Sequence, residues 1–364
     1  MASPYDGEIH FTTLGMFIID EIHYGPDSAR QVAVDIIGGG GTYGVLGARI
    51  FSPSRPSALS KTVGWIVDAG SDFPAPVLSL LESLNTHLIL RRDPTRLTTR
   101  GWNSYGENEN RAFKYLTPKK RLDVKDLVET GLVGAKCVHL ICSPVRAMDL
   151  VGELALARAR ATTGRQIVVW EPVPDLCTPE NRSDMFKAAK MVDVLSPNHD
   201  ELSAFWSFSE IPSDVEKKLE YFVQLLLHNG IGANGEGSVV VRLGKKGCLV
   251  ANRKLGMVIL PAYYDSTDGR ENHSKVVDPT GGGNTFIGGM SVGLVRTGDI
   301  LKAAAVGSVA ASYAIEQIGM PEIKETEGGE TWNRERVGER LEKYVKRVQE
   351  AGVELEVSAE ELGL

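Results

Sequence analysis

The chain has 364 residues, of which 42% are hydrophobic and 24% are charged, and its formal net charge is -7. This length and composition allow a large hydrophobic core that needs neither disulfides nor a structural metal. Acidic and basic residues are intermixed along the sequence. We therefore expect no nucleic-acid partner, because such a surface requires clustered basic residues.

The sequence lacks the signals of export, of membrane insertion and of a zinc site. The first thirty residues contain no basic segment followed by an apolar run, and no stretch approaches the roughly 20 apolar residues of a membrane span. The four cysteines form no CxxC pair, and scattered thiols of this kind are typical of buried residues in a reducing compartment. We expect a cytoplasmic protein without a membrane partner.

Short apolar runs rich in valine and isoleucine alternate with helical patterns. The predicted strands are residues 32–37, 63–67, 88–90, 137–141, 167–170, 192–195, 239–242, 248–251, 258–261 and 276–277. The predicted helices include residues 148–161, 183–190, 199–205 and 215–228. This alternation indicates a mostly parallel sheet covered on both faces. The predicted fold class is α/β, a doubly wound sheet whose ligands bind beyond the carboxyl ends of the strands.

Three regions depart from this pattern. Residues 9–24 and 86–116 are rich in Thr, Tyr, Trp and Arg, and we expect them to form a small β lid as two insertions in a single domain of residues 1–364. The charged C-terminal region is expected to contain an amphipathic surface helix at residues 332–351. Exposed strands seek partners, so a homodimer through the lid edges is compatible with the sequence.

The most informative segment is 276–290, where a predicted strand end is followed by a glycine turn and a helix. The turn reads Asp278-Pro279-Thr280-Gly281-Gly282-Gly283-Asn284. Glycines let backbone N–H groups point to one place, and the helix adds unpaired N–H groups and the positive end of its dipole. Such a turn binds phosphate and stabilises a phosphoryl group in transfer. By itself, it is equally compatible with a plain connection between a strand and a helix.

This segment resembles the second signature of the ribokinase-like (PfkB) carbohydrate kinases, Asp-Thr-Thr-Gly-Ala-Gly-Asp-Thr-Phe. The positions that match are Asp278, Thr280, Gly281, Gly283, Thr285 and Phe286. The resemblance implies a ribokinase-like fold, ATP and Mg²⁺ as cofactors, and a sugar-like or nucleoside-like small molecule as the hydroxyl acceptor. It places the γ-phosphate at the catalytic turn, which comprises Gly281, Gly282, Gly283 and Asn284. Residues 97–115 and 278–284 look most like the fungal maintenance-of-killer branch of this family.

Two further motifs resemble the family's nucleotide-binding parts. Residues 196–202 are similar to its Asn-x-x-Glu motif, which implies that Asn198 and Glu201 lie near the phosphates and near Mg²⁺, with water between. Residues 240–247 are similar to the strand and turn beside the nucleotide, although the family usually has Thr where Arg242 stands. The nucleotide contacts implied by the resemblance are therefore Asn198, Glu201, Arg242, Gly244, Gly247, Asp278 and Thr280.

The resemblance also implies an acceptor site in the first half of the chain. Residues 15–20 are similar to the family's opening strand, whose aspartate, here Asp20, would hold substrate hydroxyls. Residues 38–44 are similar to the first signature, Gly-Gly-x-Gly-Ala-Asn, and place Gly40, Gly41 and Thr42 at the acceptor. Thr42 stands where that signature has Asn. Arg100 falls where the lid strands of the family cross the sugar site.

The most consequential departure is Asn284, because the family has its catalytic aspartate there. An amide is not a base at physiological pH, and general-base catalysis contributes about 10²–10⁴-fold. Three interpretations remain open: a kinase whose base is supplied by another carboxylate or by the substrate, a nucleotide-binding pseudokinase without useful turnover, and a kinase whose acceptor is already deprotonated. Asp278 is expected to orient the loop. If the missing base limits the chemistry, Asn284→Asp should raise phosphoryl transfer.

A rival interpretation is a dinucleotide-binding oxidoreductase. The glycines at 39, 41 and 44 follow the predicted strand 32–37 and fit the G-x-G-x-x-G fingerprint, with Asp68 as the ribose-binding acid. This interpretation leaves residues 278–284 unexplained. Two other polar residues have no motif that fixes their role. Glu171 follows a predicted strand and either faces the site or starts a turn, and His139 is expected to be a hydrogen-bonded core residue.

Overall fold

The computed structural model describes residues 7–24, 32–105, 111–161, 165–206, 215–264 and 274–364. Within these residues the central sheet has the strand order β1 (Phe11–Thr13), β8 (Cys137–Cys142), β9 (Ile167–Pro172), β10 (Val194–Leu195), β11 (Ser238–Arg242), β12 (Cys248–Asn252) and β13 (Gly256–Leu260). The strands from β1 to β11 are parallel, and the last two pair antiparallel. A parallel bridge from Phe11 to Val63 joins β1 to the parallel pair β4 (Gly64–Ala69) and β5 (His87–Arg92).

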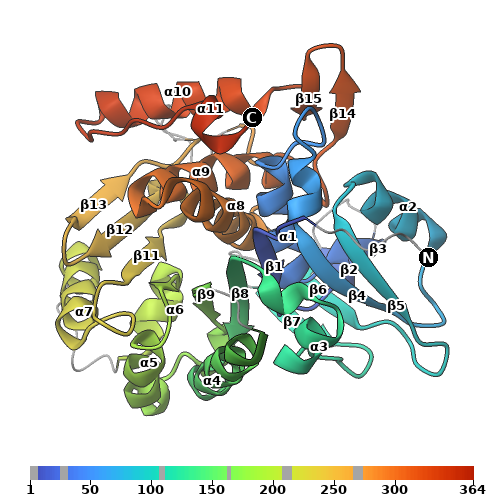
Figure 1. The fold of residues 1–364 in the computed structure, drawn as a ribbon, viewed down its shortest axis with the longest axis horizontal. Helices are drawn as coiled ribbons and strands as arrows, with labels where there is room; N and C mark the ends of the chain where they lie inside the picture. Colours follow the sequence, from blue (N-terminus) through green and yellow to red (C-terminus); the bar gives the residue numbers. More distant parts are fainter. Residues whose placement is uncertain (1–6, 25–31, 106–110, 162–164, 207–214, 265–273) are drawn as a thin grey trace.

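Helices cover both faces of this sheet (Figure 1). One face carries α1 (Gly40–Ile50), α2 (Ala75–Ser83), α8 (Gly282–Thr297) and α9 (Ile300–Ala314). The other carries α3 (Val124–Glu129), α4 (Pro144–Ala161), α5 (Arg182–Ala189), α6 (His199–Ala204) and α7 (Val215–Asn229). Successive side chains of a strand point to opposite faces, so Val240 packs in the first core while Val239 and Val241 pack in the second. The predicted doubly wound α/β fold is confirmed.

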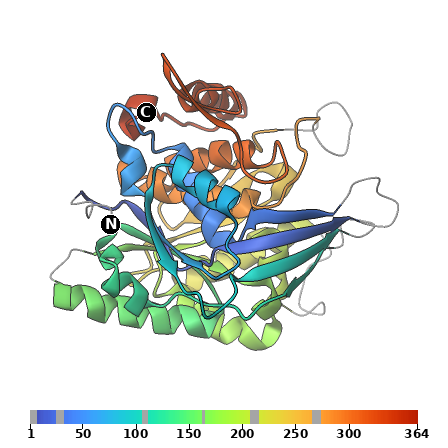
Figure 2. The same ribbon diagram turned by 90° about the vertical axis from the view of Figure 1, so that its right-hand side faces the viewer.

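A second sheet forms the lid, in the order β3 (Ala33–Gly38), β2 (Ile18–Tyr24), β6 (Arg100–Tyr105) and β7 (Arg111–Tyr115). Figure 2 shows its strands extending past the main domain on one side. The predicted lid boundaries were partly wrong. Strand β1 lies inside the main sheet, where its three residues are buried, and β5 pairs with β4. Residues 32–37, predicted for the main sheet, instead form lid strand β3 against β2.

Residues 276–277 were predicted to be a strand, and that prediction was wrong. The backbone N–H groups of Val277 and Asp278 both donate to the carbonyl of Ile315, at 2.8 and 3.2 Å. The segment therefore docks on the C-terminal end of α9 instead of pairing with a strand. Short 3-10 helices occur at Leu59–Thr62, Leu132–Gly134, Pro174–Leu176, Pro179–Asn181 and Gly244–Lys246.

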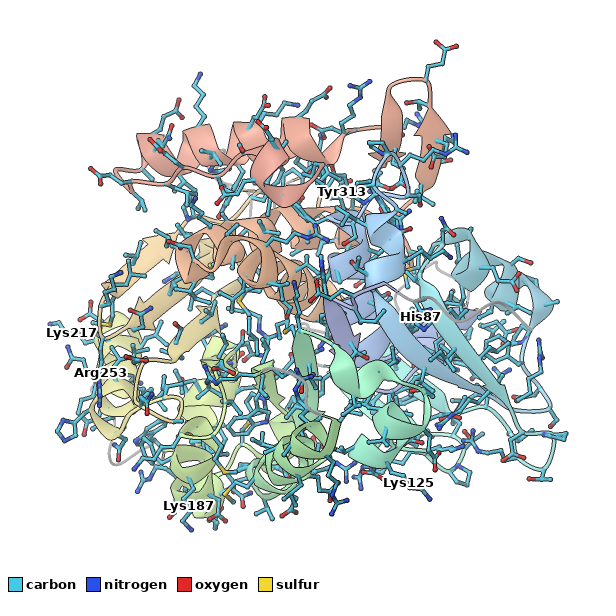
Figure 3. The ribbon with its side chains drawn as sticks, viewed as in Figure 1. His87, Lys125, Lys187, Lys217, Arg253 and Tyr313 are labelled. Carbon is cyan, nitrogen blue, oxygen red and sulfur yellow. The ribbon has the colours of Figure 1, made fainter. Side chains whose placement is uncertain are left out.

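The C-terminal region forms an outer layer over α9. It contains the hairpin of β14 (Ile323–Thr326) and β15 (Gly329–Trp332), then α10 (Val337–Glu350) and α11 (Ala359–Leu362). The helix predicted at residues 332–351 begins at Val337, because the buried Trp332 ends β15. Figure 3 places Tyr313 at the boundary between α9 and this layer, where the guanidinium of Arg340 lies 3.6 Å from the centre of its ring.

Helices α1 and α8 cross in close contact because glycines line their interface. A Cβ atom on Gly47 would lie 1.9 Å from the carbonyl oxygen of Thr285, and one on Gly288 would lie 1.8 Å from that of Gly44. At the N-terminal ends, a Cβ atom on Gly40 would lie 3.0 Å from the side-chain nitrogen of Asn284. The close packing therefore brings the two glycine motifs of the sequence to one place.

The buried cysteines agree with the sequence analysis. All four thiols are free and buried, and burial raises the pKa of each to about 12. In the part of the chain that the structure describes, no helix is both long enough and apolar enough to cross a bilayer.

Candidate active site

The glycine turn lies at the start of α8, and Asp278 holds its shape. The carboxylate of Asp278 accepts the N–H of Thr280 at 2.9 Å, which agrees with its expected loop-orienting role. Gly281 is the N-cap with φ of 77°, and its carbonyl accepts both the N–H and the hydroxyl of Thr285. The first N–H groups of a helix have no intrahelical partner. The N–H groups of Gly283 and Asn284 are thus available for an anion.

Gly281 tolerates no side chain in this conformation. A Cβ atom there would lie 2.3 Å from the ring of Tyr43 on α1, in addition to the strain of a positive φ. We expect Gly281→Ala to weaken MgATP binding at least about tenfold, a loss of about 1.4 kcal/mol, because the turn must shift to relieve the collision. Calorimetric titration of the variant with MgATP measures this loss.

Gly298 provides a matched control at the other end of α8. Its φ is 66°, and a Cβ atom there would meet nothing within 4 Å. Gly298→Ala should therefore cost about 1–2 kcal/mol of stability from the left-handed backbone alone and leave MgATP affinity unchanged. Equal loss of affinity in both variants would contradict the proposed role of the turn.

The side chain of Asn284 is bonded to a buried carboxylate. Its amide nitrogen donates to Glu171 Oε2 at 2.6 Å, and His139 Nε2 lies 3.3 Å from the same oxygen. Glu171 is the penultimate residue of β9 and is 5% exposed, while His139 in β8 is fully buried with its Nδ1 atom 3.3 Å from the hydroxyl of Thr13. The prediction that His139 is a hydrogen-bonded core residue is confirmed. Glu171 faces the catalytic turn.

Arg242, at the end of β11, connects the turn with two carboxylates. Its Nη2 atom lies 2.8 Å from Glu171 Oε1 and 3.1 Å from Glu201 Oε2. Its Nη1 atom faces the turn, since a Cβ atom on Gly283 would lie 2.2 Å from it. Among the described residues, Arg242 Nε has no hydrogen-bond partner. The guanidinium therefore has capacity left to bind an anion at the turn.

Asn198 and Glu201 form a closed capping box at the start of α6. The backbone and side-chain nitrogens of Asn198 each donate to the Glu201 carboxylate at 2.8 Å, and Glu201 N–H donates back to Asn198 Oδ1 at 2.8 Å. The sequence predicted these two residues near the phosphates, and the structure brings both next to Arg242. The arrangement also satisfies the N-terminus of α6.

Two buried carboxylates share one guanidinium here, and their pKa values separate. Burial raises the pKa of Glu201 to about 7, with the nearby Glu171 charge adding to the effect and Arg242 opposing it. Burial also disfavours ionised Glu171, but Arg242, His139 and Asn284 outweigh burial and hold the pKa of Glu171 below its ordinary value. Glu171 is therefore the carboxylate that stays ionised.

A pocket of about 230 Å³ opens beside the turn. Three predicted nucleotide contacts, Arg242, Gly244 and Gly247, line it together with Gly282 and Gly283. Its other lining residues come from α8, α9 and the segments before α8, and they are Lys245, Ala262, Tyr263, Tyr264, Val276, Pro279, Phe286, Ser308, Ala311, Ser312 and Ile315. The walls are mainly apolar, and the turn contributes Pro279, Gly282 and Gly283 to the lining. This shape suits a nucleotide with its base in the pocket and its phosphates at the turn.

The predicted acceptor residues lie on α1 and the lid. Asp20 is 8% exposed and packs between two glycines, since Cβ atoms on Gly38 and Gly101 would lie 1.9 and 2.6 Å from its carboxylate. Thr42 is buried in α1, and its hydroxyl has no partner among the described residues. Arg100 instead pairs with Asp72 at 2.6 Å and Asp35 at 2.8 Å, so its charge is already matched.

The geometry does not suit a dinucleotide fingerprint. That motif needs the strand before the glycines to lie in the parallel sheet, whereas β3 lies in the lid. Asp68 accepts hydrogen bonds from Arg91 at 2.8 and 2.7 Å and from Lys120 at 3.1 Å, and so is fully engaged. The oxidoreductase interpretation was wrong.

Comparison with known proteins identifies the family. The model of the pfkB family of carbohydrate kinases matches residues 105–327. This chain is a member of the pfkB family. It is 36% identical over 351 residues to Protein MAK32 of Saccharomyces cerevisiae, covering 92% of each chain, and 37% identical over 345 residues to an uncharacterised protein of Schizosaccharomyces pombe, covering 93% of each. It thus belongs to the fungal maintenance-of-killer branch.

A solved pfkB-type structure supports the fold. Ribokinase from Cryptococcus neoformans in complex with ADP superimposes with a TM-score of 0.61 at 19% identity, covering 86% of this chain and 96% of the ribokinase. The ribokinase-like fold predicted from the motifs is confirmed. Compared with the pfkB motifs, this member differs at Thr42, Arg242 and Asn284, and two of these residues contact Glu171.

Sequence reasoning missed part of the site of this pfkB protein. The α9 residues and the two tyrosines at positions 263 and 264 that line the pocket belong to no motif. Nothing in the sequence pattern distinguished them from residues that only pack in the core. Glu171 did carry a signal, because it follows a buried strand at the carboxyl edge where ligands of this fold bind. Its contact with Asn284 spans 113 positions of the sequence and is visible only in the fold.

Proposed function

We propose that this protein is an ATP-dependent kinase that transfers the γ-phosphoryl group to a hydroxyl of a sugar-like or nucleoside-like small molecule. The observation that carries the proposal is that the glycine turn, the start of α8 and Arg242 meet in the lining of a single pocket. Membership of the pfkB carbohydrate kinases and the ADP complex of the Cryptococcus ribokinase support the same chemistry.

The protein's own groups would act mainly on the charge of the phosphoryl group. The N–H groups of the catalytic turn and the dipole of α8 would bind the terminal phosphate. Arg242 Nη1 faces the same turn and would add a full positive charge. Fixed charges of this kind in a water-poor site supply most of the catalysis in phosphoryl transfer.

The acceptor would bind between the start of α1 and the lid. Gly40 lies against the side chain of Asn284, so a molecule held at this helix N-terminus has a hydroxyl next to the turn. Asp20 on lid strand β2 would accept two neighbouring hydroxyls. Lid closure would exclude water, so that the phosphoryl group reaches the acceptor instead of water.

Magnesium fits this site only through water. Both oxygens of Glu201 already accept bonds from Asn198 or Arg242, and the described residues contain no cluster of three or more His, Cys, Asp or Glu side chains that could hold a metal. Mg²⁺ retains several waters and binds substrate phosphates readily. When bound, it would neutralise phosphate charge, with Asn198 and Glu201 beyond its water shell.

One observation favours a second candidate, a nucleotide-binding pseudokinase without useful turnover. Position 284 has no base, and its amide is engaged by Glu171. Both candidates share the nucleotide site and differ only in chemistry.

A two-step experiment tests the proposal. Calorimetric titration should show magnesium-dependent ATP binding, and ADP production should rise when a panel of polyols, pentoses and nucleosides is added. No heat at millimolar ATP would contradict both candidates. Binding without ADP production from any acceptor, or from water, would favour the pseudokinase.

A further inference from the structure

Glu171 is the one carboxylate in contact with the side chain that replaces the family's base, as far as the described residues go. Its Oε2 atom lies 2.6 Å from the amide nitrogen of Asn284, and its Oε1 atom lies 2.8 Å from Arg242. Its side chain is 7% exposed. Burying this carboxylate costs desolvation free energy, even with three partners. Apolar residues at the same place near the carboxyl end of β9 would avoid that cost.

We propose that Glu171 is the proton acceptor of phosphoryl transfer in this protein, in place of the missing carboxylate at position 284. The inference rests on the proposed kinase function. A general base must lie within hydrogen-bond reach of the proton that it takes, directly or through one water. An acceptor hydroxyl beside Asn284 meets this condition when one water connects it with Glu171 Oε2, which lies 2.6 Å from the amide nitrogen of Asn284.

The step balances without another reactant. The hydroxyl oxygen of the acceptor forms a bond to the γ-phosphorus, and the bond from this phosphorus to the β,γ-bridging oxygen breaks. The electron pair of the broken bond leaves with ADP, and the hydroxyl proton moves to Glu171 Oε2. His139 Nε2 lies 3.3 Å from the same oxygen, and the hydroxyl of Thr13 lies 3.3 Å from His139 Nδ1.

Arg242 links the proton acceptor to the nucleotide. Its guanidinium pairs with Glu171 and at the same time faces Gly283. A triphosphate at the turn competes for this guanidinium and weakens its hold on Glu171. Glu171 thus becomes more basic only when the phosphoryl donor is present.

The test uses MgATP with water as the acceptor, since water also yields a proton. We expect Glu171→Gln to lower inorganic phosphate release by about 10²–10⁴-fold without weakening calorimetric MgATP affinity, because Arg242 loses a competitor of the phosphates. Restoring a carboxylate at the family's position, in the double variant Glu171→Gln with Asn284→Asp, should bring release back to within about tenfold of the wild type. A purely structural role of Glu171 would not produce this rescue.

Glu330→Gln is the matched control. Glu330 is 5% exposed and pairs with the buried Arg49 at 2.7 Å, far along the chain from the turn. The control should lose stability as Glu171→Gln does and keep phosphate release. Unchanged release in Glu171→Gln, or no rescue in the double variant, would overturn the inference, as would wild-type protein that binds MgATP and releases no phosphate. A wild type that binds no MgATP would instead refute the kinase function itself.

Discussion

Replacing Arg242 by methionine is expected to reduce turnover and stability together. Methionine keeps the apolar stem but removes the cation that faces Gly283 and bonds Glu171 and Glu201. An arginine that stabilises the phosphoryl group in transfer contributes about 10³–10⁵-fold, so we expect turnover to fall by at least about 10³-fold. Removing one partner of a buried ion pair costs about 3–5 kcal/mol. Phosphate release and urea denaturation measure the two effects.

Two control variants separate charge from geometry. Arg242→Lys keeps the charge but offers a single nitrogen instead of a fork, so its turnover and its free energy of unfolding should fall between those of the wild type and Arg242→Met. Arg165→Met removes an arginine that lies just before β9. The side chain of Arg165 is 75% exposed and pairs with Asp193. The substitution should cost at most about 1 kcal/mol. Full turnover in Arg242→Met would contradict a phosphate contact.

The elements that could be predicted are those that a short stretch of sequence determines by itself. Strands β8, β9 and β11 are short runs rich in apolar residues, and α4 and α5 follow the first two along the chain. The parallel sheet could therefore be predicted from period and composition. The glycine turn was also predictable, because three consecutive glycines at the start of a helix have a direct conformational meaning. Their roles needed no knowledge of distant contacts.

The unpredictable part depends on partners that are distant in sequence. Strand β1 has only three residues, two of them threonines, and such a segment suits an exposed hairpin as well as a buried strand. Its burial comes from β8 and Val63, more than fifty positions away. Likewise, β3 is an ordinary strand by composition, and only its pairing with β2 assigns it to the lid.

The same limit applied to the site. The sequence identified Asn284 as the departure and left open a base supplied by another carboxylate, but no local pattern connected Glu171 with position 284. In the structure Asp278 is bonded to Thr280, while Glu171 reaches Asn284 from a different strand. The departure at Arg242 is also explained by the structure. Arg242 compensates the charge of Glu171, and Glu171 is the carboxylate bonded to Asn284, the other departure from the motifs.

Asn284→Asp alone is expected to leave turnover within about tenfold of the wild type at pH 7. If the wild type had no base, the same substitution should instead raise turnover by about 10²–10⁴-fold. The structure changes the expectation because an aspartate at position 284 would place its carboxylate at hydrogen-bond distance from Glu171. Two carboxylates this close cannot both ionise easily, so one pKa of the pair rises and the two groups share a proton. Phosphate release measured from pH 5 to 9 tests this.

The same variant should show a distinctive dependence of stability on pH. Between the usual carboxyl pKa of about 4 and the raised value, the folded variant binds one proton more than the unfolded chain, so its stability falls as pH rises, by about 1.4 kcal/mol for each unit that the pKa is raised. Adding Glu171→Gln removes the second carboxylate and should abolish this dependence. A gain of 10²-fold or more in Asn284→Asp alone would mean that the wild type has no working base, and Glu171 could then not be the proton acceptor.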